Sequence, residues 1–358
     1  MHRIVAEDIQ TIASGIQSET KKLEGKTLLI SGGSGFLGSY LVGTIRLLNQ
    51  NVLQKPCRVL SLDNFITGSR SAVTGADADE NITHIETDVR NQLDIHEPID
   101  FIIHAAGLAS PVYYQKFPLE TIETTVTGAK NLLELARQTQ SVKSFLFFSS
   151  SEIYGDPDPS FIPTPETYNG NVSCTGPRAC YDESKRLTET ICMVYHKMYH
   201  IPVKIVRPFN VYGPGMKMND YRVVPSFITK GLAGSPIYVY NNGNQTRTFC
   251  YVTDAVTGFF KVLLSERNGE TYNVGSDAEE ISMIALADIV SSLFPRAVAI
   301  KSIEYPETYP AGEPNRRRPD ITKIRAKLGY RPAVDLRTGL SRTLTWFRET
   351  LPSDSVLV

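Results

Sequence analysis

Short apolar runs alternate with longer amphipathic segments over the first two thirds of the chain. The apolar runs are rich in β-branched and aromatic residues, and they predict strands at 27–31, 58–62, 82–86, 101–104, 145–149 and 203–207. The amphipathic segments predict helices at 35–48, 119–138 and 181–199. Strands that alternate with helices indicate a parallel sheet, and continuous apolar runs such as FLFF indicate that helices cover both of its faces.

The composition changes after residue 207, where Gly and Pro become frequent. From there on, short segments that resemble strands alternate irregularly with predicted helices. We expect an N-terminal helical extension at 1–24, a sheet domain at 25–207 with returns near 242–270, and a smaller, interleaved C-terminal α/β lobe at 208–358. Ile9, Ile12 and Ile16 share one face of the helix expected in the extension. This pattern predicts a helix that docks against the body or against a partner.

A glycine turn lies between the first predicted strand and the first long helix, in TLLISGGSGFLGSYLV. Gly32, Gly35 and Gly38 provide a tight turn, close backbone approach and a helix N-terminus whose free N–H groups face an anion. Glycine spacing alone is a weak signal, but its position between strand and helix predicts a dinucleotide site. Phe36 and Leu37, which lie between Gly35 and Gly38, are also expected to bind the cofactor. The expected fold is a Rossmann-type, doubly wound parallel sheet, with the smaller lobe binding substrate.

An acidic residue follows the second strand, where RVLSLD ends at Asp63. A carboxylate there accepts hydrogen bonds from the adenosine ribose and repels a 2′-phosphate, which favours NAD over NADP. The alternative is a simple turn residue. Further cofactor contacts are expected from residues at strand ends, namely Asn64, Asp88, Val89 and Ala105.

The composition narrows the possible partners. Charged residues make up 21% of the 358 residues and the formal net charge is −1, which argues against a general nucleic-acid binder. No apolar run is long enough to span a bilayer, and the first ten residues carry charges, so we expect a cytoplasmic protein without membrane contact. The five cysteines form no C-x-x-C pair, so neither a disulfide framework nor a metal site is expected.

A candidate catalytic pair lies in YDESK, where Tyr181 and Lys185 are four residues apart on one helix face. About one such pair is expected by chance, and a solvated helix face is the alternative. The serines at 149–151 favour a catalytic role for the pair. They end a predicted strand at the carboxyl edge of the sheet, where ligands bind in folds of this kind. A lysine ammonium favours a phenolate, so the tyrosine can act as a base.

Together these features resemble the extended short-chain dehydrogenase/reductase superfamily, the NAD-dependent nucleotide-sugar epimerases and dehydratases. The resemblance runs from about Gly25 onward. Within the superfamily the chain is most similar to the UDP-glucuronate decarboxylases, also called UDP-xylose synthases. Five segments carry this similarity: GPRACYDESKR, MNDYRVV, QTRTFCYVTD, RRRPDITK and LGYRP.

The resemblance implies roles for individual residues. Ser150, Tyr181 and Lys185 match the catalytic trio. Substrate-binding roles are implied for Asn210, for Arg222 at the diphosphate, for Arg247, and for one of Arg317 and Arg318. Guanidinium forks suit diphosphate oxygens, although a surface ion pair is the alternative for each arginine. At position 125 the family usually has asparagine, whereas this chain has Thr125. This difference puts in doubt whether residue 125 binds a structural water.

The residues after Ser150 separate the reactions of the superfamily. Dehydratases have Asp-Glu there, whereas this chain has Ser151 and Glu152, and a hydroxyl is too weak an acid to drive loss of water. The Ser-Glu pair resembles decarboxylases. This implies a lyase that converts UDP-glucuronate to UDP-xylose through a 4-keto intermediate, with NAD recycled internally. Glu152 would order a proton-donating water or oppose the substrate carboxylate, which Arg178 or Arg247 would position.

The alternatives are a UDP-sugar or UDP-uronate 4-epimerase, then a nucleotide-sugar 4,6-dehydratase. A non-catalytic NAD-binding protein is disfavoured because the catalytic trio is intact. The helices at 119–138 and 181–199 are long and apolar, and superfamily members often pair through such helices. We therefore expect a homodimer.

Overall fold

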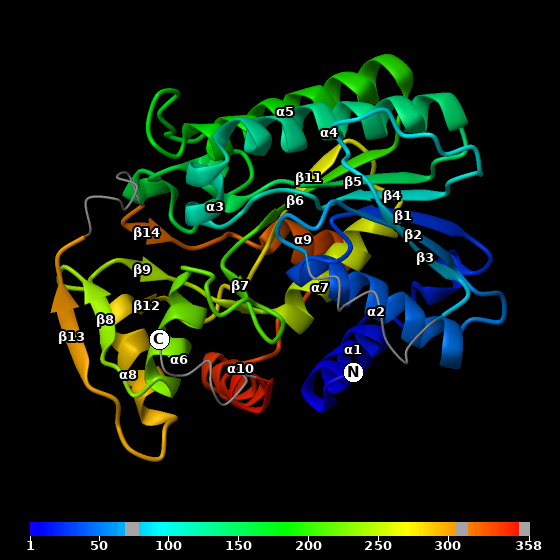
Figure 1. The fold of residues 1–358 in the computed structure, drawn as a ribbon. Coiled ribbons are helices and arrows are strands. Elements are labelled where there is room, and N and C mark those ends of the chain that lie inside the picture. The colour runs from blue at the N-terminus through cyan, green and yellow to red at the C-terminus, as the bar shows by residue number, and fades with distance from the viewer. Residues whose placement is uncertain (69–78, 306–313, 351–358) are drawn as a thin grey trace.

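The computed structural model describes residues 1–68, 79–305 and 314–350. Within them, seven parallel strands form the main sheet: β1 (Thr27–Ser31), β2 (Arg58–Asp63), β3 (Ile82–Glu86), β4 (Phe101–His104), β5 (Ser144–Phe148), β6 (Val203–Pro208) and β11 (Glu270–Val274). Their order is β11-β6-β5-β4-β1-β2-β3 (Figure 1). Because β1 has β2 on one side and β4 on the other, the chain reverses its direction across the sheet there. This is the doubly wound arrangement that the sequence predicted.

The six predicted strands are confirmed to within one residue, whereas β11 was not predicted. Its sequence, ETYNV, has Glu270, Thr271 and Asn273 among its five residues. Among the described strands, β11 pairs with β6 alone and so forms an edge of the sheet. An edge strand can keep polar residues, and a short, largely polar run gives no clear strand pattern in the sequence.

Helices cover both faces of the sheet (Figure 1). On one face lie α4 (Pro118–Thr139) and α5 (Ala179–Tyr199), and the short α3 (Pro111–Lys116) precedes α4. On the other face lie α2 (Phe36–Asn51) and α7 (Val252–Leu263). The three predicted helices are confirmed as α2, α4 and α5. Apolar strand side chains are buried against both layers, which explains why β5 is buried at every position.

The N-terminal helix α1 (Arg3–Gly15) packs against α2 and α7 and is followed by the short 3₁₀ helix η1 (Thr20–Leu23). Ile9, Ile12 and Ile16 are buried in the core on this side of the sheet. A Cβ in place of the hydrogen of Gly43 in α2 would lie 2.6 Å from Ile9 Cδ1, so the glycine allows this close contact. The predicted docking helix therefore docks on the body of the protein.

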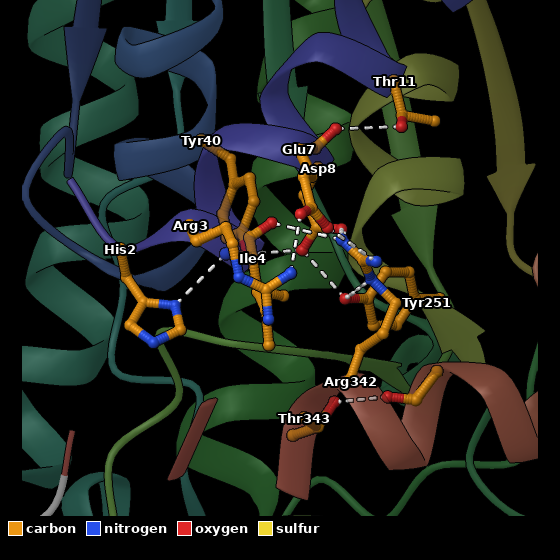
Figure 2. A network of polar contacts seen from close by, with 11 residues as sticks. His2, Arg3, Ile4, Glu7, Asp8, Thr11, Tyr40, Tyr251, Arg342 and Thr343 are labelled. Carbon is orange, nitrogen blue, oxygen red and sulfur yellow. Dashed lines mark hydrogen bonds and ion pairs between the residues drawn. The ribbon is translucent and has the colours of Figure 1, made fainter. Parts of the chain in front are cut away.

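A buried carboxylate also fixes α1, as Figure 2 shows. Asp8 is 1% exposed and accepts hydrogen bonds from the hydroxyls of Tyr40 on α2, at 3.2 Å, and Tyr251, at 2.8 Å. Arg342, near the C-terminal end of the described chain, forms an ion pair with the same carboxylate, with Nη2 2.8 Å from Oδ1. This network joins the N-terminal helix to the sheet domain and to the last described helix.

The C-terminal lobe contains several short strand pairings. β7 (Val211–Tyr212) pairs with β10 (Cys250–Tyr251), β8 (Ile237–Tyr240) pairs with β13 (Ile300–Ile303), and β9 (Thr246–Arg247) lies between β12 (Ile281–Ser282) and β14 (Arg316–Arg317). Its helices are α6 (Val223–Leu232), α8 (Met283–Ser292), α9 (Thr322–Leu328) and α10 (Leu336–Thr350). Two 3₁₀ helices, η3 (Ser151–Tyr154) and η4 (Pro159–Phe161), precede the lobe in the chain.

The lobe and the sheet domain share one hydrophobic core. Leu286 of α8 and Leu340 of α10 belong to the same buried cluster as Ile45 of α2. The chain also returns to the sheet domain at α7 and β11, after the lobe has begun. Among the described helices, none is long and apolar enough to cross a membrane.

Candidate active site

A cavity of about 1140 Å³ lies at the carboxyl edge of the sheet, between the sheet domain and the lobe. Open α/β sheets bind ligands at this edge, next to the point where the strand order reverses. The sheet domain contributes to its wall Ala105, Gly107, the segment 149–152, Arg178, Tyr181 and Lys185. The lobe contributes Asn210, Arg222, Arg247 and Arg317.

The glycine turn after β1 has the geometry of a dinucleotide site. Gly32 has φ +78°, and a Cβ there would lie 2.8 Å from the backbone nitrogen of Ala106. A Cβ on Gly38 would collide with the carbonyl oxygen of Gly32. A side chain at position 32 would therefore push the turn away from the segment after β4. A side chain at position 38 would push the first turn of α2 away from the glycine turn.

The start of α2 is open for an anion. Its N-cap residue is Gly35, which has no side chain to cap the first N–H groups. The buried hydroxyl of Ser34 has no hydrogen-bond partner among the described residues. Phe36, Leu37 and Ala105 line the cavity beside this turn. These residues fit a dinucleotide whose pyrophosphate accepts hydrogen bonds from the helix N-terminus.

The carboxylate of Asp63, at the end of β2, lies against the glycine turn. Its Oδ2 accepts a hydrogen bond from Ser34 N at 3.0 Å, and its Oδ1 accepts one from Phe65 N at 2.8 Å. Asp63 is therefore held beside the turn, where we expected the adenosine ribose.

The other residues expected on the adenosine side form a cluster of their own. Asn64 Nδ2 donates to Asp88 Oδ2 at 3.1 Å, and Arg90 forms an ion pair with the same carboxylate. Val89, next in the chain, is buried. None of these four residues lines the large cavity, and the carboxylate of Asp88 orders this loop.

The three residues predicted to be the catalytic trio, Ser150, Tyr181 and Lys185, come together at the wall of the cavity. Lys185 Nζ donates to the carbonyl oxygen of Phe148 at 2.8 Å, which ties α5 to the end of β5. Burial lowers the pKa of Lys185 to about 8. Burial also raises the pKa of Tyr181 to about 12, against the opposite effect of its hydrogen bond with Ser150. Tyr181 is thus protonated in the free cavity and needs positive charge beside it to act as a base.

Glu152, in η3, is held by two arginines. Its Oε2 lies 2.5 Å from Arg178 Nη2 and 2.6 Å from Arg317 Nη2. Burial by itself would raise the pKa of Glu152, but the charges of Arg178, Arg317 and Arg247 outweigh it and lower the pKa to about 2. Glu152 is therefore ionised and does not donate a proton at neutral pH.

The remaining predicted substrate residues of the lobe also line the cavity. Arg222 is the N-cap residue of α6 and donates from Nε to Asp220 Oδ1 at 2.9 Å. Arg247 Nη2 donates to the carbonyl oxygen of Pro314 at 2.6 Å, which fixes its guanidinium in the wall. Asn210 adopts φ +41° and donates from Nδ2 to the carbonyl oxygen of Thr248 at 2.8 Å.

Arg317 and Arg318 are adjacent in the chain but make different contacts. Arg317 lines the cavity, whereas Arg318 does not and donates instead to the carbonyl oxygen of Asp277 at 3.1 Å. Of these two alternatives, the structure therefore brings Arg317 to the site. Ser151, next to Glu152, is buried and lines the cavity.

Thr125 lies in α4, which packs against α5, and it is fully buried. Its hydroxyl has no partner among the described residues, while its carbonyl oxygen accepts a hydrogen bond from Thr188 Oγ1 of α5 at 3.3 Å. The backbone of Thr125 thus connects α4 to α5, and the side chain that departs from the family takes no part in this contact.

Two further residues of the site were not predicted from the sequence. Tyr114 of α3 lines the cavity and stacks on Tyr181, and the two ring centroids are 5.4 Å apart. Asp182 follows Tyr181 and does not line the cavity, but its Oδ2 lies 3.7 Å from Nε of Arg178 in the wall, and its burial raises its pKa to about 7. Neither gave a signal, because Tyr114 has an identical neighbour in Tyr113 and Asp182 belongs to an ordinary polar helix face. Within the described part of the chain, no group of three or more candidate metal ligands occurs.

Comparisons with known proteins agree with this geometry. Residues 28–275 match the model of the NAD dependent epimerase/dehydratase family. UDP-glucuronic acid decarboxylase 5 of Arabidopsis thaliana is 40% identical over 313 residues, which cover 87% of this chain and 86% of that relative. UDP-glucuronic acid decarboxylase 1 of Xenopus tropicalis is 38% identical over 326 residues, covering 91% and 73%.

Solved structures with the same fold include two 4-epimerases. UDP-glucose 4-epimerase from Thermotoga maritima has a TM-score of 0.79 and 25% identity, over 91% of this chain and 100% of that one. A mutant of UDP-glucuronic acid 4-epimerase from Bacillus cereus, solved with UDP-4-deoxy-4-fluoro-glucuronic acid and NAD, has a TM-score of 0.76 and 25% identity, over 91% and 100%. Because the family match spans most of the chain and includes the glycine turn and the catalytic trio, this protein belongs to the NAD-dependent epimerase/dehydratase family.

Proposed function

We propose that this protein decarboxylates UDP-glucuronate to UDP-xylose. The observation that carries the proposal is the ionised Glu152 between Arg178 and Arg317, at the wall that also holds Tyr181. Two guanidinium groups and one carboxylate leave a net positive charge there, which suits the carboxylate of a uronic sugar. Relatives of 38–40% identity are UDP-glucuronic acid decarboxylases, which supports the same substrate.

The residues of the chain account for the proton transfers. NAD would be held by the glycine turn and the start of α2, at Gly32, Gly35 and Gly38, and it would supply reversible hydride transfer at C4 of the sugar. Tyr181 takes the proton of the 4-hydroxyl, while the positive charge of Lys185 favours the phenolate. Ser150 holds the Tyr181 hydroxyl by a hydrogen bond. The product of this step is a 4-keto uronate.

Decarboxylation follows because the carboxylate is then β to a ketone. The C5–C6 bond breaks, its electrons form an enolate between C4 and C5, and carbon dioxide leaves. Glu152 is ionised and held by arginines, so the proton that C5 then receives comes from another donor, such as water. When the ketone is reduced, Tyr181 gives its proton to the oxygen at C4 and the hydroxyl forms again, so the reaction as a whole is redox-neutral.

A 4-epimerase is the second candidate. The fold shared with the UDP-glucuronic acid 4-epimerase of Bacillus cereus favours it, since that enzyme was solved with a fluorinated UDP-glucuronic acid and NAD. The Ser151–Glu152 pair and the two arginines that hold Glu152 favour the decarboxylase.

The direct test is to incubate the protein with UDP-glucuronate and measure carbon dioxide and a UDP-pentose. We expect both products in equal amounts from the wild type. The Tyr181→Phe variant, which removes the proton acceptor but little volume, should retain less than about a hundredth of this activity. Inversion at C4 without carbon dioxide would establish the epimerase instead.

We further propose that two copies of the chain associate through α4 and α5. Large apolar side chains are exposed on both helices: Leu119, Ile122, Leu187, Val194 and Met198. The three on α5 are seven and four residues apart, so they share one face of the helix. A second copy of the same pair of helices would cover this face as a four-helix bundle.

A further inference from the structure

Tyr114 lines the cavity and packs against two other residues of its wall. Its ring stacks on Tyr181, with an angle of 18° between the two planes, and the Arg178 guanidinium lies 5.9 Å from its centroid. The residue is 1% exposed. Tyr114 therefore contacts both the base and one of the arginines that hold Glu152.

The hydroxyl of Tyr114 is a donor without an acceptor. It is buried and has no hydrogen-bond partner among the described residues, although the residue lines the cavity. Burial raises the pKa of Tyr114, so its hydroxyl keeps its proton at neutral pH. Buried tyrosine hydroxyls normally have a partner, and a group that enters the cavity can supply it.

The surrounding groups indicate what that partner must be. Arg178 and Arg317 are donors, and both direct a guanidinium N–H to the same oxygen of Glu152. A third donor, the Tyr114 hydroxyl, belongs to the same part of the wall, because the Arg178 guanidinium that binds Glu152 also lies over the ring of Tyr114. This part of the wall therefore offers more donors than acceptors, and it matches an anionic ligand group.

This inference rests on the proposed function: we propose that Tyr114 donates a hydrogen bond to the carboxylate of the uronic sugar and thereby selects uronates over neutral hexoses. A phenol binds this carboxylate without adding charge. The hydrogen bond holds the group that leaves as carbon dioxide, beside the base that takes the proton of the 4-hydroxyl.

The position of this hydrogen bond predicts a specific kinetic effect. The carboxylate loses its negative charge as carbon dioxide forms, so the hydrogen bond stabilises the bound substrate at least as well as the transition state. Its removal should therefore raise KM and leave kcat nearly unchanged. A residue that only supports the ring of Tyr181 would lower kcat instead.

The test is the Tyr114→Phe variant, which keeps the ring that stacks on Tyr181. We expect KM for UDP-glucuronate to rise about tenfold, as for loss of a hydrogen bond to a charged group, with kcat within about threefold of the wild type. Affinity for UDP, which lacks the carboxylate, should not change. Tyr113→Phe is the matched control, because Tyr113 is adjacent and does not line the cavity.

A binding measurement separates this proposal from the proposed function. By calorimetry, the preference of the NAD-loaded protein for UDP-glucuronate over UDP-glucose should fall about tenfold in Tyr114→Phe. This measurement does not need turnover, so it tests Tyr114 even if the wild type releases no carbon dioxide. The thermal midpoint should stay equal or rise, since the variant removes an unpaired buried hydroxyl.

Two results would overturn the proposal. One is an unchanged preference for UDP-glucuronate over UDP-glucose in Tyr114→Phe. The other is a lower kcat at unchanged KM, which would show that Tyr114 only supports the ring of Tyr181.

Discussion

Glu152 keeps its negative charge in a buried position because two arginines surround it. A buried carboxylate without such partners would bind a proton and become neutral. The charge in turn limits how tightly Arg178 and Arg317 can hold the carboxylate of a substrate. We therefore propose that Glu152 acts in the decarboxylation step rather than in the oxidation, for which Tyr181 is the proposed base.

Glu152→Gln should separate the two steps. Glutamine keeps the shape but not the charge, so both arginines would hold the substrate carboxylate more firmly and resist its departure. We expect NADH to accumulate on the enzyme when UDP-glucuronate is added, measured by absorbance. Carbon dioxide release should slow at least about tenfold, or about 1.4 kcal/mol of barrier.

The control for this experiment is Glu97→Gln, which removes a carboxylate from an exposed ion pair with Arg58. It should leave both steps unchanged. Carbon dioxide release at the wild-type rate from Glu152→Gln would show that Glu152 is structural.

For Lys185, in contrast to Glu152, burial disfavours the charged form of the side chain and lowers the stability of the native protein. Its pKa falls from 10.5 to about 8, because burial disfavours the ammonium. Between these values the unfolded chain binds more protons than the native protein, so the contribution of Lys185 to stability rises as pH increases from about 8 to 10.5. At pH 7 the native protein bears the full cost of the buried charge.

Lys185→Met should therefore abolish activity and stabilise the cofactor-free protein. The shift from 10.5 to about 8 corresponds to roughly 3 kcal/mol, less the lost hydrogen bond to Phe148, so we expect a gain of about 1–2 kcal/mol in the free energy of unfolding. Denaturant titration at pH 7 measures it, with Lys327→Met at an exposed position of α9 as the control. A loss of stability would contradict the prediction.

At the scale of elements, α1 depends on Asp8. Burial raises the pKa of Asp8, against the opposing effects of its hydrogen bonds and of Arg342. Burial therefore disfavours the charge of this carboxylate, and the ion pair with Arg342 favours it (Figure 2). Stability from such a group is complete below its unfolded pKa and is lost as pH rises through its higher native pKa.

Arg342→Met should leave Asp8 as an unpaired buried charge. We expect the free energy of unfolding to fall by about 3 kcal/mol at about pH 7.5, measured in denaturant. Because the pKa of Asp8 would then rise further, acidification to about pH 5 should restore part of the loss. Adding Asp8→Asn to the same chain should also restore part of it.

The matched control is Arg58→Met, which breaks an exposed ion pair and should cost less than about 1 kcal/mol. If the loss in Arg342→Met were the same at both pH values, the network would not act through the charge of Asp8.

At the scale of the whole molecule, the apolar face of α4 and α5 predicts a dimer. Light scattering at micromolar concentration should give twice the mass of one chain. Leu187→Arg introduces a charge at this face and should give a monomer that still binds NAD, because Leu187 is half exposed and does not line the cavity. Phe161→Arg, at an exposed site on η4, should stay dimeric. A monomeric wild type would refute the prediction.

The sequence alone determined most of the sheet domain. Strands such as FLFF and helices such as that at 181–199 carry local patterns of hydrophobicity, and these patterns follow from burial on one or both faces. The glycine turn could be predicted too, since a tight turn between strand and helix allows few other residues. β11 was missed because this edge strand has no such pattern.

Only the tertiary structure decided which of the candidate residues meet in the active site. Glu152, Arg178 and Arg317 are brought together from η3, the start of α5 and β14, and no spacing in the sequence records that contact. It also decided between Arg317 and Arg318, and it placed Tyr114 rather than its neighbour against the base. The physical reason is that local sequence patterns report burial, whereas the ionisation of a site depends on charges that meet only when distant segments pack together.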